Sequence, residues 1–266
     1  MNTPEARGVS RVTTALLDCY AKVEALCADL SDAEWQTQSL CPDWTVRDVV
    51  NHVTSIEAVM AAWLPDDDRT PPPFDKAADF LRDAGAAGAA YVDVVRAVYD
   101  RRRRDLAALT DADLARPSWT PVGPATYGRF LEIRVFDFWV HERDITTPLG
   151  RRTDDTGPAA EIALAEVEGS LGYIVGKKVG LQEGKSITFN LTGPIERELH
   201  VAVDGRAKRV DHLDNPDVTV STDSTTFIQL ACGRIDPQAQ IDSGAVTWEG
   251  GHELGDRAAR NLRFTM

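Results

Sequence analysis

The sequence predicts a helical first half followed by a smaller α+β domain with an antiparallel sheet. Three observations predict this fold. Apolar residues recur at helical spacing in four long segments before residue 150. After residue 180 the period changes to two in three short segments. A polar stretch, GRRTDDTGP, separates the two patterns and reads as a linker. We therefore expect two domains, residues 1–150 and 151–266.

The first two helices are expected over about residues 9–30 and 45–63. The first has apolar residues three or four positions apart along its length. The short stretch DAEWQ after Ser31 reads as a capped turn. At the start of the second helix, Thr45 and Asp48 have the spacing of a capping box, which satisfies free N–H groups at a helix N-terminus.

Two further helices are expected over about residues 75–109 and 127–147. Proline-rich loops precede both of them, LPDDDRTPPPFD and RPSWTPVGPATYG. The third helix is expected either to be continuous or to break at its Ala/Gly-rich stretch. We expect its RRRR run, 101–104, to lie on a solvated face. Four long helices joined by loops predict an antiparallel bundle.

The second half is expected to begin with a helix over about residues 158–176. Three strands follow in SITFNLTG, ELHVAVDG and DVTVSTD, which alternate apolar and polar residues and end at turn residues. The segment DSTTFIQLACGR then reads as a capped helix that ends at Gly233, and the tail GHELGDRAARNLRFTM as another short helix. Helices combined with a small antiparallel sheet give an α+β domain.

Composition narrows the classes of function. The formal net charge of −13 disfavours nucleic acid as a partner, because the surface would repel phosphates. Four cysteines form no CxxC pair, which excludes zinc-finger and dithiol redox motifs. The N-terminus has no apolar signal-peptide region, and no apolar run reaches membrane-spanning length. We expect a cytoplasmic protein with no membrane partner.

The stretch FDFWVHERD, 136–144, places polar groups in an otherwise apolar helix. Asp137 and His141 are four residues apart, so they share one helix face about 6 Å apart along the axis. His52 lies among apolar residues of the second helix and could supply a third ligand. Two histidines and one carboxylate leave a coordination position open, as in catalytic zinc sites. The alternatives are a hydrogen bond between Asp137 and His141, an ion pair of Asp137 with Arg134, and a metal-free acid–base dyad.

Other polar residues have two interpretations each. Asp144 is expected to pair locally or to orient a metal ligand. Arg234, in ACGR, is expected either to stabilise a helix C-terminus or to anchor a carboxylate substrate. Glu57 and Glu132 are expected to be surface acids.

Three segments resemble one known family. CPDWTVRDVVNHVTSIE resembles the first signature of the mycothiol-dependent maleylpyruvate isomerase family, which is part of the DinB-like helical bundle superfamily. FDFWVHERDI resembles its second signature, an acid, three residues, a histidine, two residues and an aspartate. VTVSTDSTTFIQLACGRID resembles the start of the family's C-terminal domain helix. The resemblance implies a DinB-like metal-binding four-helix bundle over 1–150 and a C-terminal domain of the maleylpyruvate isomerase type over 151–266.

The resemblance also implies a site. A divalent metal, usually zinc, would be held by His52, Asp137 and His141. The isomerase has Glu at the position of Asp137, and the shorter side chain could shift the position or identity of the metal. Arg234 matches the family's functional arginine in its "aGR" segment, which implies a catalytic role in holding a substrate carboxylate.

The implied function is a metal-dependent enzyme with mycothiol as thiol cosubstrate. A bound cation deprotonates a coordinating thiol, and the thiolate then adds to an electrophilic small molecule. Both a cis–trans isomerase and a thiol S-transferase fit this chemistry. One alternative is a non-catalytic small-molecule or lipid-binding protein, because the second half resembles sterol-carrier-like domains. The other is a thiol-independent metalloenzyme of the same fold. The expected partners are the low-molecular-weight thiol and the electrophile, and we expect a monomer or weak dimer.

Overall fold

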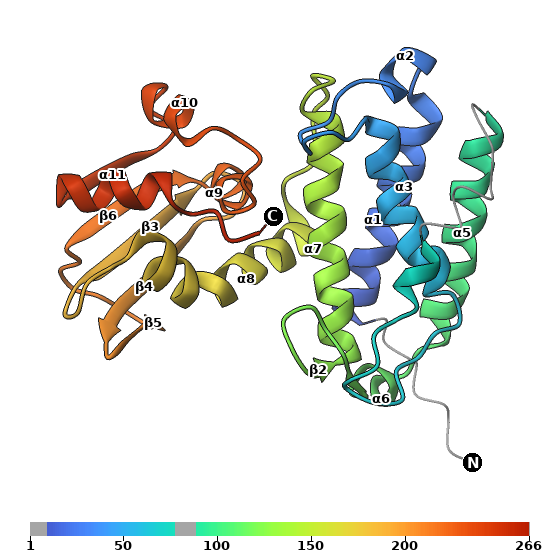
Figure 1. Cartoon of the computed structure of the whole chain (residues 1–266), viewed down its shortest axis with the longest axis horizontal. Coiled ribbons are helices and arrows are strands. Elements are labelled where there is room, and N and C mark those ends of the chain that lie inside the picture. Colours follow the sequence, from blue (N-terminus) through green and yellow to red (C-terminus); the bar gives the residue numbers. More distant parts are fainter. Residues whose placement is uncertain (1–9, 78–88, 266) are drawn as a thin grey trace. The chain divides into compact units, whose positions relative to one another are not determined.

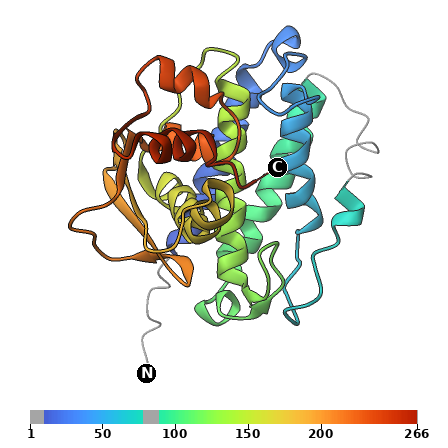
Figure 2. The ribbon, with the colours of Figure 1, turned by 60° about the vertical axis from the view of Figure 1, so that its left-hand side comes forward.

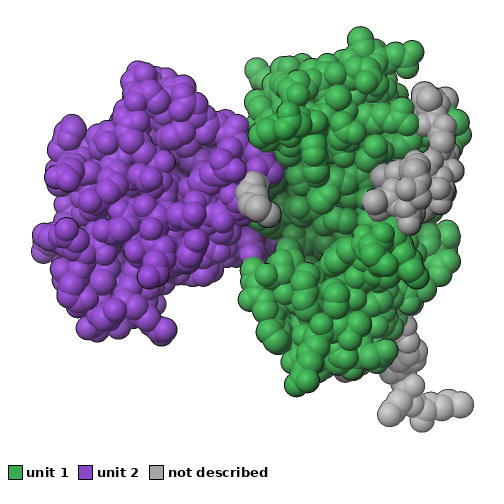
Figure 3. Space-filling model, in the orientation of Figure 1, with its two compact units in different colours: residues 1–153 green, residues 154–266 purple. Residues whose placement is uncertain are grey.

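The computed structural model describes residues 10–77 and 89–265 of the chain (Figure 1). The chain divides into two compact units, Met1–Thr153 and Asp154–Met266, which Figure 3 shows in different colours. Each unit is considered by itself below. Among the described residues, no helix combines the length and the apolar character that crossing a membrane requires.

The first unit is built on four long helices. Helices α1 and α3 each pack against both α5 and α7, so the four enclose a common core. Their bounds are α1 Arg11–Asp29, α3 Val46–Val59, α5 Ala89–Ala108 and α7 Tyr127–Thr146.

Hydroxyl side chains fix where three of these helices begin. Ser10 caps α1 and Thr126 caps α7, each by accepting a backbone N–H from the first turn. Thr45 and Asp48 form the expected capping box at the start of α3. These caps position α3 and α7, the helices that carry the candidate site.

Short elements connect the long helices. Two short strands, β1 and β2, pair in an antiparallel ladder before α7. The elements are α2 Asp32–Trp35, η1 Phe74–Lys76, α6 Asp111–Leu114, β1 Pro117–Ser118 and β2 Ala125–Thr126.

Aromatic rings fill the centre of the helical unit. The rings of Tyr20 on α1 and Tyr99 on α5 stack with centroids 4.7 Å apart, and Phe138 on α7 meets both edge-on. All three side chains are buried. Such ring pairs add to the free energy gained from burial alone, and they join three of the four helices.

The second unit contains a five-stranded sheet of order β5-β4-β3-β6-β7. Three neighbouring pairs are antiparallel, whereas β3 and β6 are parallel. The bounds are β3 Ser186–Thr192, β4 Arg197–Asp204, β5 Arg206–Val210, β6 Val218–Asp223 and β7 Thr247–Gly250.

Helices pack on this sheet. Helix α8 contacts β4 and β5, α9 contacts β3 and β6, and α11, the dark red helix of Figure 2, contacts β6 and β7. Phe189 of β3 lies in register with Leu199 and Val220, and its ring meets Phe227 of α9 at 5.2 Å. The bounds are α8 Gly157–Tyr173, η2 Ile174–Val179, α9 Ser224–Ala231, α10 Pro237–Asp242 and α11 His252–Arg260.

A helical first part and a later sheet with antiparallel strands are confirmed. The sheet is mixed rather than wholly antiparallel, because the chain leaves β5 at one edge and returns on the far side of β3. Strands β5 and β7 and helix α10 were not predicted. The predicted helix over 75–109 includes residues 78–88, which lie outside the described part of the chain.

Candidate metal centre

Two helices bring three predicted ligands together in the first unit. His52 lies on α3, and Asp137 and His141 lie one turn apart on α7. Asp137 stands between the two imidazoles: Oδ2 is 3.5 Å from His52 Nε2, and Oδ1 is 3.4 Å from His141 Nε2. The ring centroids of the histidines are 4.9 Å apart, and one ligand atom from each residue lies within 4.8 Å of the others.

These separations are close to those between ligands of one metal ion. Bonds of about 2.0–2.2 Å at tetrahedral angles place neighbouring N and O donors about 3.3–3.5 Å apart. Each distance from Asp137 to an imidazole is in or near that range, but the two distances involve different carboxylate oxygens, so the three side chains are close to a tetrahedral arrangement rather than already in it. The exposed fractions of the side chains are 31% for His52, 25% for Asp137 and 8% for His141, so the His52 side of the group is the more open.

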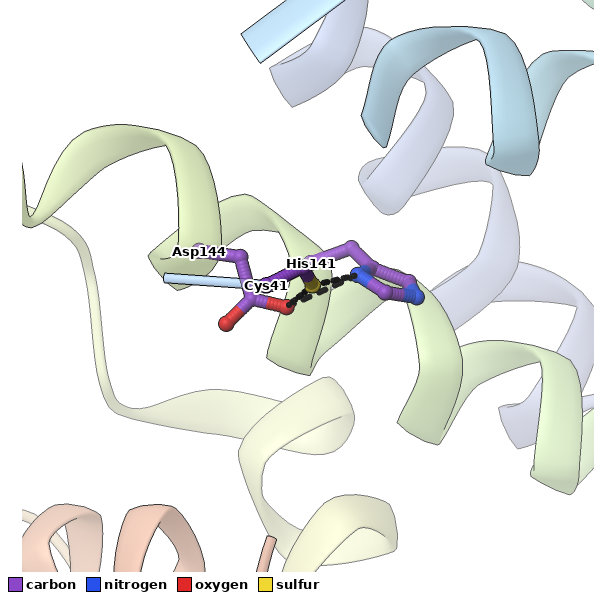
Figure 4. A group of neighbouring side chains, drawn as sticks. All are labelled: Cys41, His141 and Asp144. Atoms are coloured by element: carbon purple, nitrogen blue, oxygen red, sulfur yellow. Dashed lines mark hydrogen bonds and ion pairs between the residues drawn. The ribbon is translucent and has the colours of Figure 1, made fainter. Parts of the chain in front are cut away.

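A buried carboxylate orients His141. Its Nδ1 lies 2.8 Å from Asp144 Oδ2, and Asp144 is fully buried (Figure 4). An N–H at Nδ1 leaves the lone pair on Nε2, which faces Asp137. Carboxylates commonly hold metal-bound histidines in this way and raise their basicity. This hydrogen bond confirms the local pairing of Asp144, and its role in orienting a metal ligand stays a prediction.

Cys41 extends this arrangement. Its Sγ donates to Asp144 Oδ2 at 3.1 Å and lies 3.9 Å from His141 Nδ1 (Figure 4). The backbone N–H of Leu40 donates to the Asp144 carbonyl, which fixes the loop beside α7. Cys41, His141 and Asp144 could also be regarded as a ligand set. The 2.8 Å separation is that of a hydrogen bond and is shorter than two donors on one metal ion adopt, so we interpret this group as support for His141.

The electrostatics of the group favour a cation. Burial opposes the charge on Asp137, but Arg134 and His141 outweigh burial and hold the pKa of Asp137 well below its ordinary value. Burial likewise opposes the charge on His141, yet Asp137 and the hydrogen bond to Asp144 raise the pKa of His141 well above its ordinary value. Both shifts favour a protonated His141 beside an ionised Asp137. A metal ion would have to displace a proton of His141, which would make metal affinity depend on pH.

A second charged cluster lies behind Asp137. Arg134 bridges Asp137 and Glu57, and its Nε is 3.0 Å from Glu57 Oε1. Arg102 donates to the other oxygen of Glu57 at 2.8 Å, and Tyr20 donates to it as well. Glu57 has no exposed surface. Burial raises the pKa of Glu57, but the two guanidiniums outweigh that effect, so it lies below its ordinary value.

Two expectations are therefore wrong. Glu57 is a buried anion rather than a surface acid, and Arg102 of the RRRR run is 1% exposed rather than solvated. The two residues neutralise each other across α3 and α5. Glu132 is partly exposed, as expected. Asp137 makes both contacts that were considered as alternatives to metal binding, one with His141 and one with Arg134.

Sequence models of two domains match the chain. The mycothiol maleylpyruvate isomerase N-terminal domain matches residues 16–146, and the C-terminal domain of the same enzyme matches residues 161–257.

The chain belongs to the mycothiol-dependent maleylpyruvate isomerase family.

Solved structures share the fold of this family member. A crystal structure of the mycothiol-dependent maleylpyruvate isomerase matches with a TM-score of 0.61 at 17% identity, over 94% of this chain and 96% of that one. A histidine-to-alanine variant of that enzyme matches with a TM-score of 0.58, also at 17% identity and with the same coverage. None of the curated proteins compared with the chain matches it. At this identity the structural likeness bears on the fold alone.

Arg234, the remaining predicted site residue of this family member, lies in the second unit. It follows α9, whose C-terminal turn ends at Gly233 with φ of +66°. Its Nη1 donates to the carbonyl of Cys232 at 2.9 Å, and its backbone N–H donates to that of Gln229. These bonds correspond to the helix C-terminal interpretation of Arg234. The structure does not relate Arg234 to the three ligands, which belong to the other unit.

Proposed function

We propose that this protein is a divalent-metal enzyme that uses mycothiol to add sulfur to an electrophilic small molecule, with cis–trans isomerisation as its reaction. The observation that carries the proposal is the convergence of His52, Asp137 and His141 from two helices, with His141 held by a buried carboxylate. We also assign residues 1–150 to a DinB-like metal-binding four-helix bundle and residues 151–266 to an α+β C-terminal domain of the maleylpyruvate isomerase type.

The three ligands suit zinc. Two neutral imidazoles and one carboxylate give a net site charge of +1 with a divalent ion and leave one position for another ligand. A divalent ion so held would lower the pKa of a thiol and favour the thiolate, which is the nucleophile.

The side chains of the chain hold this arrangement in place. Asp144 fixes the tautomer of His141, so Nε2 points to Asp137. Arg134, itself anchored by Glu57, fixes the carboxylate of Asp137. Arg234 of the second domain is assigned the role of pairing with a carboxylate of the substrate.

The reaction balances without an outside reductant or oxidant. The thiolate forms a C–S bond to one carbon of a cis double bond conjugated with a carbonyl, and the π electrons move to the carbonyl oxygen. Rotation about the resulting single bond follows. The electrons then return, the C–S bond breaks, and the trans product and the thiolate are released. In an S-transferase reaction the C–S bond would persist and another group would leave.

The test is metal content combined with thiol dependence. Purified protein should hold about one divalent ion per chain, and the isomerisation of a cis-enone diacid should require added mycothiol. His52→Ala and His141→Ala should lose the metal while keeping the circular dichroism of the parent protein. A protein that converts the substrate equally well without mycothiol would be a thiol-independent metalloenzyme. One that holds no metal would favour the binding-protein alternative.

A further inference from the structure

A histidine and an acid share one face of strand β4 in the second unit. Glu198 and His200 are two residues apart, so both side chains project from the same side of the sheet. Helix α8 packs on the other side, where Arg197 of β4 and Arg209 of β5 pair with Glu168 of that helix. Glu198 and His200 therefore lie on the face of these strands that points away from α8.

A second histidine approaches from the neighbouring strand. In the antiparallel pairing of β4 with β5, His200 faces Val210, the last residue of β5. Continuing this register by two residues places His212 opposite Glu198, because each step back along β4 is matched by one step forward along β5. The ring centroids of His200 and His212 are 5.8 Å apart, so His212 remains beside His200 beyond the end of the strand.

One nitrogen of each imidazole is already engaged. His200 Nδ1 lies 2.9 Å from Thr188 Oγ1 on β3, and His212 Nε2 lies 3.1 Å from Asp214 Oδ1. These hydrogen bonds leave His200 Nε2 and His212 Nδ1 for another partner, and oxygen groups orient metal-bound histidines in this way. His200 Nε2 is 3.7 Å from Glu198 Oε2, which is beyond the distance of a hydrogen bond.

The separation of the rings is close to that of two imidazoles on one ion. Bonds of about 2.0–2.1 Å at tetrahedral angles place the centroids of two such rings about 5 Å apart. Glu198 and His212 must turn toward His200 Nε2 for all three donors to reach one ion. Their side chains are 62% and 70% exposed, whereas that of His200 is 8% exposed. One fixed ligand and two adjustable ones therefore meet on this face.

The local charge favours a cation. Lys208, on the same face of β5, lies 3.1 Å from the carboxylate of Asp204, which offsets its charge. Glu198 and Asp214 place two acids around the imidazoles. A cation is therefore favoured over an anion in the space between the rings. The loop 211–217 after β5 has no lysine or arginine and contains three aspartates, Asp211, Asp214 and Asp217.

We propose that Glu198, His200 and His212 form a second metal site, for a divalent transition metal such as zinc, copper or nickel. Imidazole suits these ions, whereas calcium and magnesium prefer oxygen ligands. The bound ion would tie the loop 211–217 to β4. Ordering two exposed side chains opposes binding, so this site should fill only after the candidate metal centre. It is independent of the proposed function, because the two sites share no ligand.

The test is a zinc titration of a chain that lacks the first site. In His52→Ala/His141→Ala, calorimetry should find one zinc ion per chain, and further replacement of His212 by alanine should abolish this binding. Glu198→Gln should weaken it at least tenfold, because the charged ligand is lost. The matched control, His252→Ala, removes another exposed histidine of the same unit and should leave the binding unchanged.

The intact chain supplies a second readout. Saturating zinc should slow hydrogen exchange of the amides in residues 211–217 at least tenfold, because a loop tied to the sheet opens less often. His212→Ala should abolish this slowing and should reduce the zinc bound at saturation from two ions per chain to one.

The outcomes separate the two proposals. Zinc binding by the double variant that survives His212→Ala, or that His252→Ala reduces equally, would overturn the second site, as would a folded double variant that binds no zinc. If the intact chain binds a single ion that His212→Ala removes and His52→Ala leaves, the second site stands and the proposed function fails. The reverse result would refute the second site while the proposed function stands.

Discussion

Replacement of Asp144 should weaken metal binding, although Asp144 is proposed to orient His141 and not to bind the metal itself. Its Oδ2 accepts the Nδ1–H of His141 at 2.8 Å and the S–H of Cys41 at 3.1 Å, in a fully buried environment. Asp144→Asn keeps an oxygen that can accept these bonds but removes the negative charge that makes His141 more basic. Asp144→Ala removes the acceptor as well.

The magnitude follows from these contacts. Partners that orient metal-bound histidines typically change metal affinity by 10- to 100-fold, which is about 1.4–2.7 kcal/mol. Asp144→Asn should lie near the tenfold end, because geometry survives and only charge is lost. Asp144→Ala should lie near the hundredfold end, because the ring of His141 is no longer fixed and its Nδ1–H is left buried without this acceptor.

The assay is competition for zinc against a chromophoric chelator at pH 7, with circular dichroism as the check on folding. If both variants fold and bind zinc as tightly as the parent protein, Asp144 does not support metal binding. If Asp144→Asn is as damaging as His141→Ala, the carboxylate acts as a ligand rather than as an orienting group.

Four further results are expected. Glu57→Gln should lower the free energy of unfolding by about 3–5 kcal/mol in urea melts, because the buried guanidiniums of Arg102 and Arg134 lose the carboxylate that they share, whereas Glu132→Gln should change it by less than about 0.5 kcal/mol. Folding lowers the pKa of Glu57, so its ionised carboxylate stabilises the protein above the ordinary carboxyl pKa, and this stabilisation is lost as pH falls through the pKa of the folded state. The metal-free protein should therefore unfold in acid, and the loss of stability caused by Glu57→Gln should be smaller there. Cys41→Ser should bind zinc like the parent protein, and Cys41→Ala roughly three- to tenfold more weakly, because only serine keeps a donor to the buried carboxylate. Burial raises the pKa of Cys19 and Cys27 to about 12, so mass spectrometry after alkylation at pH 8 should find both unmodified until the protein is denatured.

Local patterns predicted much of the fold and most of the candidate group. The capping box at Thr45 and Asp48 marks the start of α3, and the four-residue spacing of Asp137 and His141 places both on one face of α7. That His52 faces them depends on how α3 and α7 pack, which one sequence does not specify. The family resemblance supplied that pairing.

Other features depend on distant partners. Glu57 is buried because Arg102 and Arg134, 45 and 77 residues away, neutralise it. A local signal existed, since Glu57 follows Val53 by four residues and so lies on the apolar face of α3.

The missed strands lacked the alternating pattern. Strand β5, Arg206–Val210, is mostly polar and lies at one edge of the sheet, and β7, Thr247–Gly250, is short and lies at the other. Edge strands need not carry a continuous apolar face, and charged residues on them hinder pairing with other chains. The parallel pairing of β3 with β6 follows from strand order, which a pattern along the chain does not encode.

The most direct test is a crystal structure of the zinc-loaded protein with data collected on both sides of the zinc absorption edge. We expect one anomalous peak in the helical unit, within about 2.0–2.2 Å of His52 Nε2, an Asp137 carboxylate oxygen and His141 Nε2. A peak on the other side of the His141 ring, bonded to Cys41 and Asp144, would contradict the account, as would well-ordered side chains with no peak.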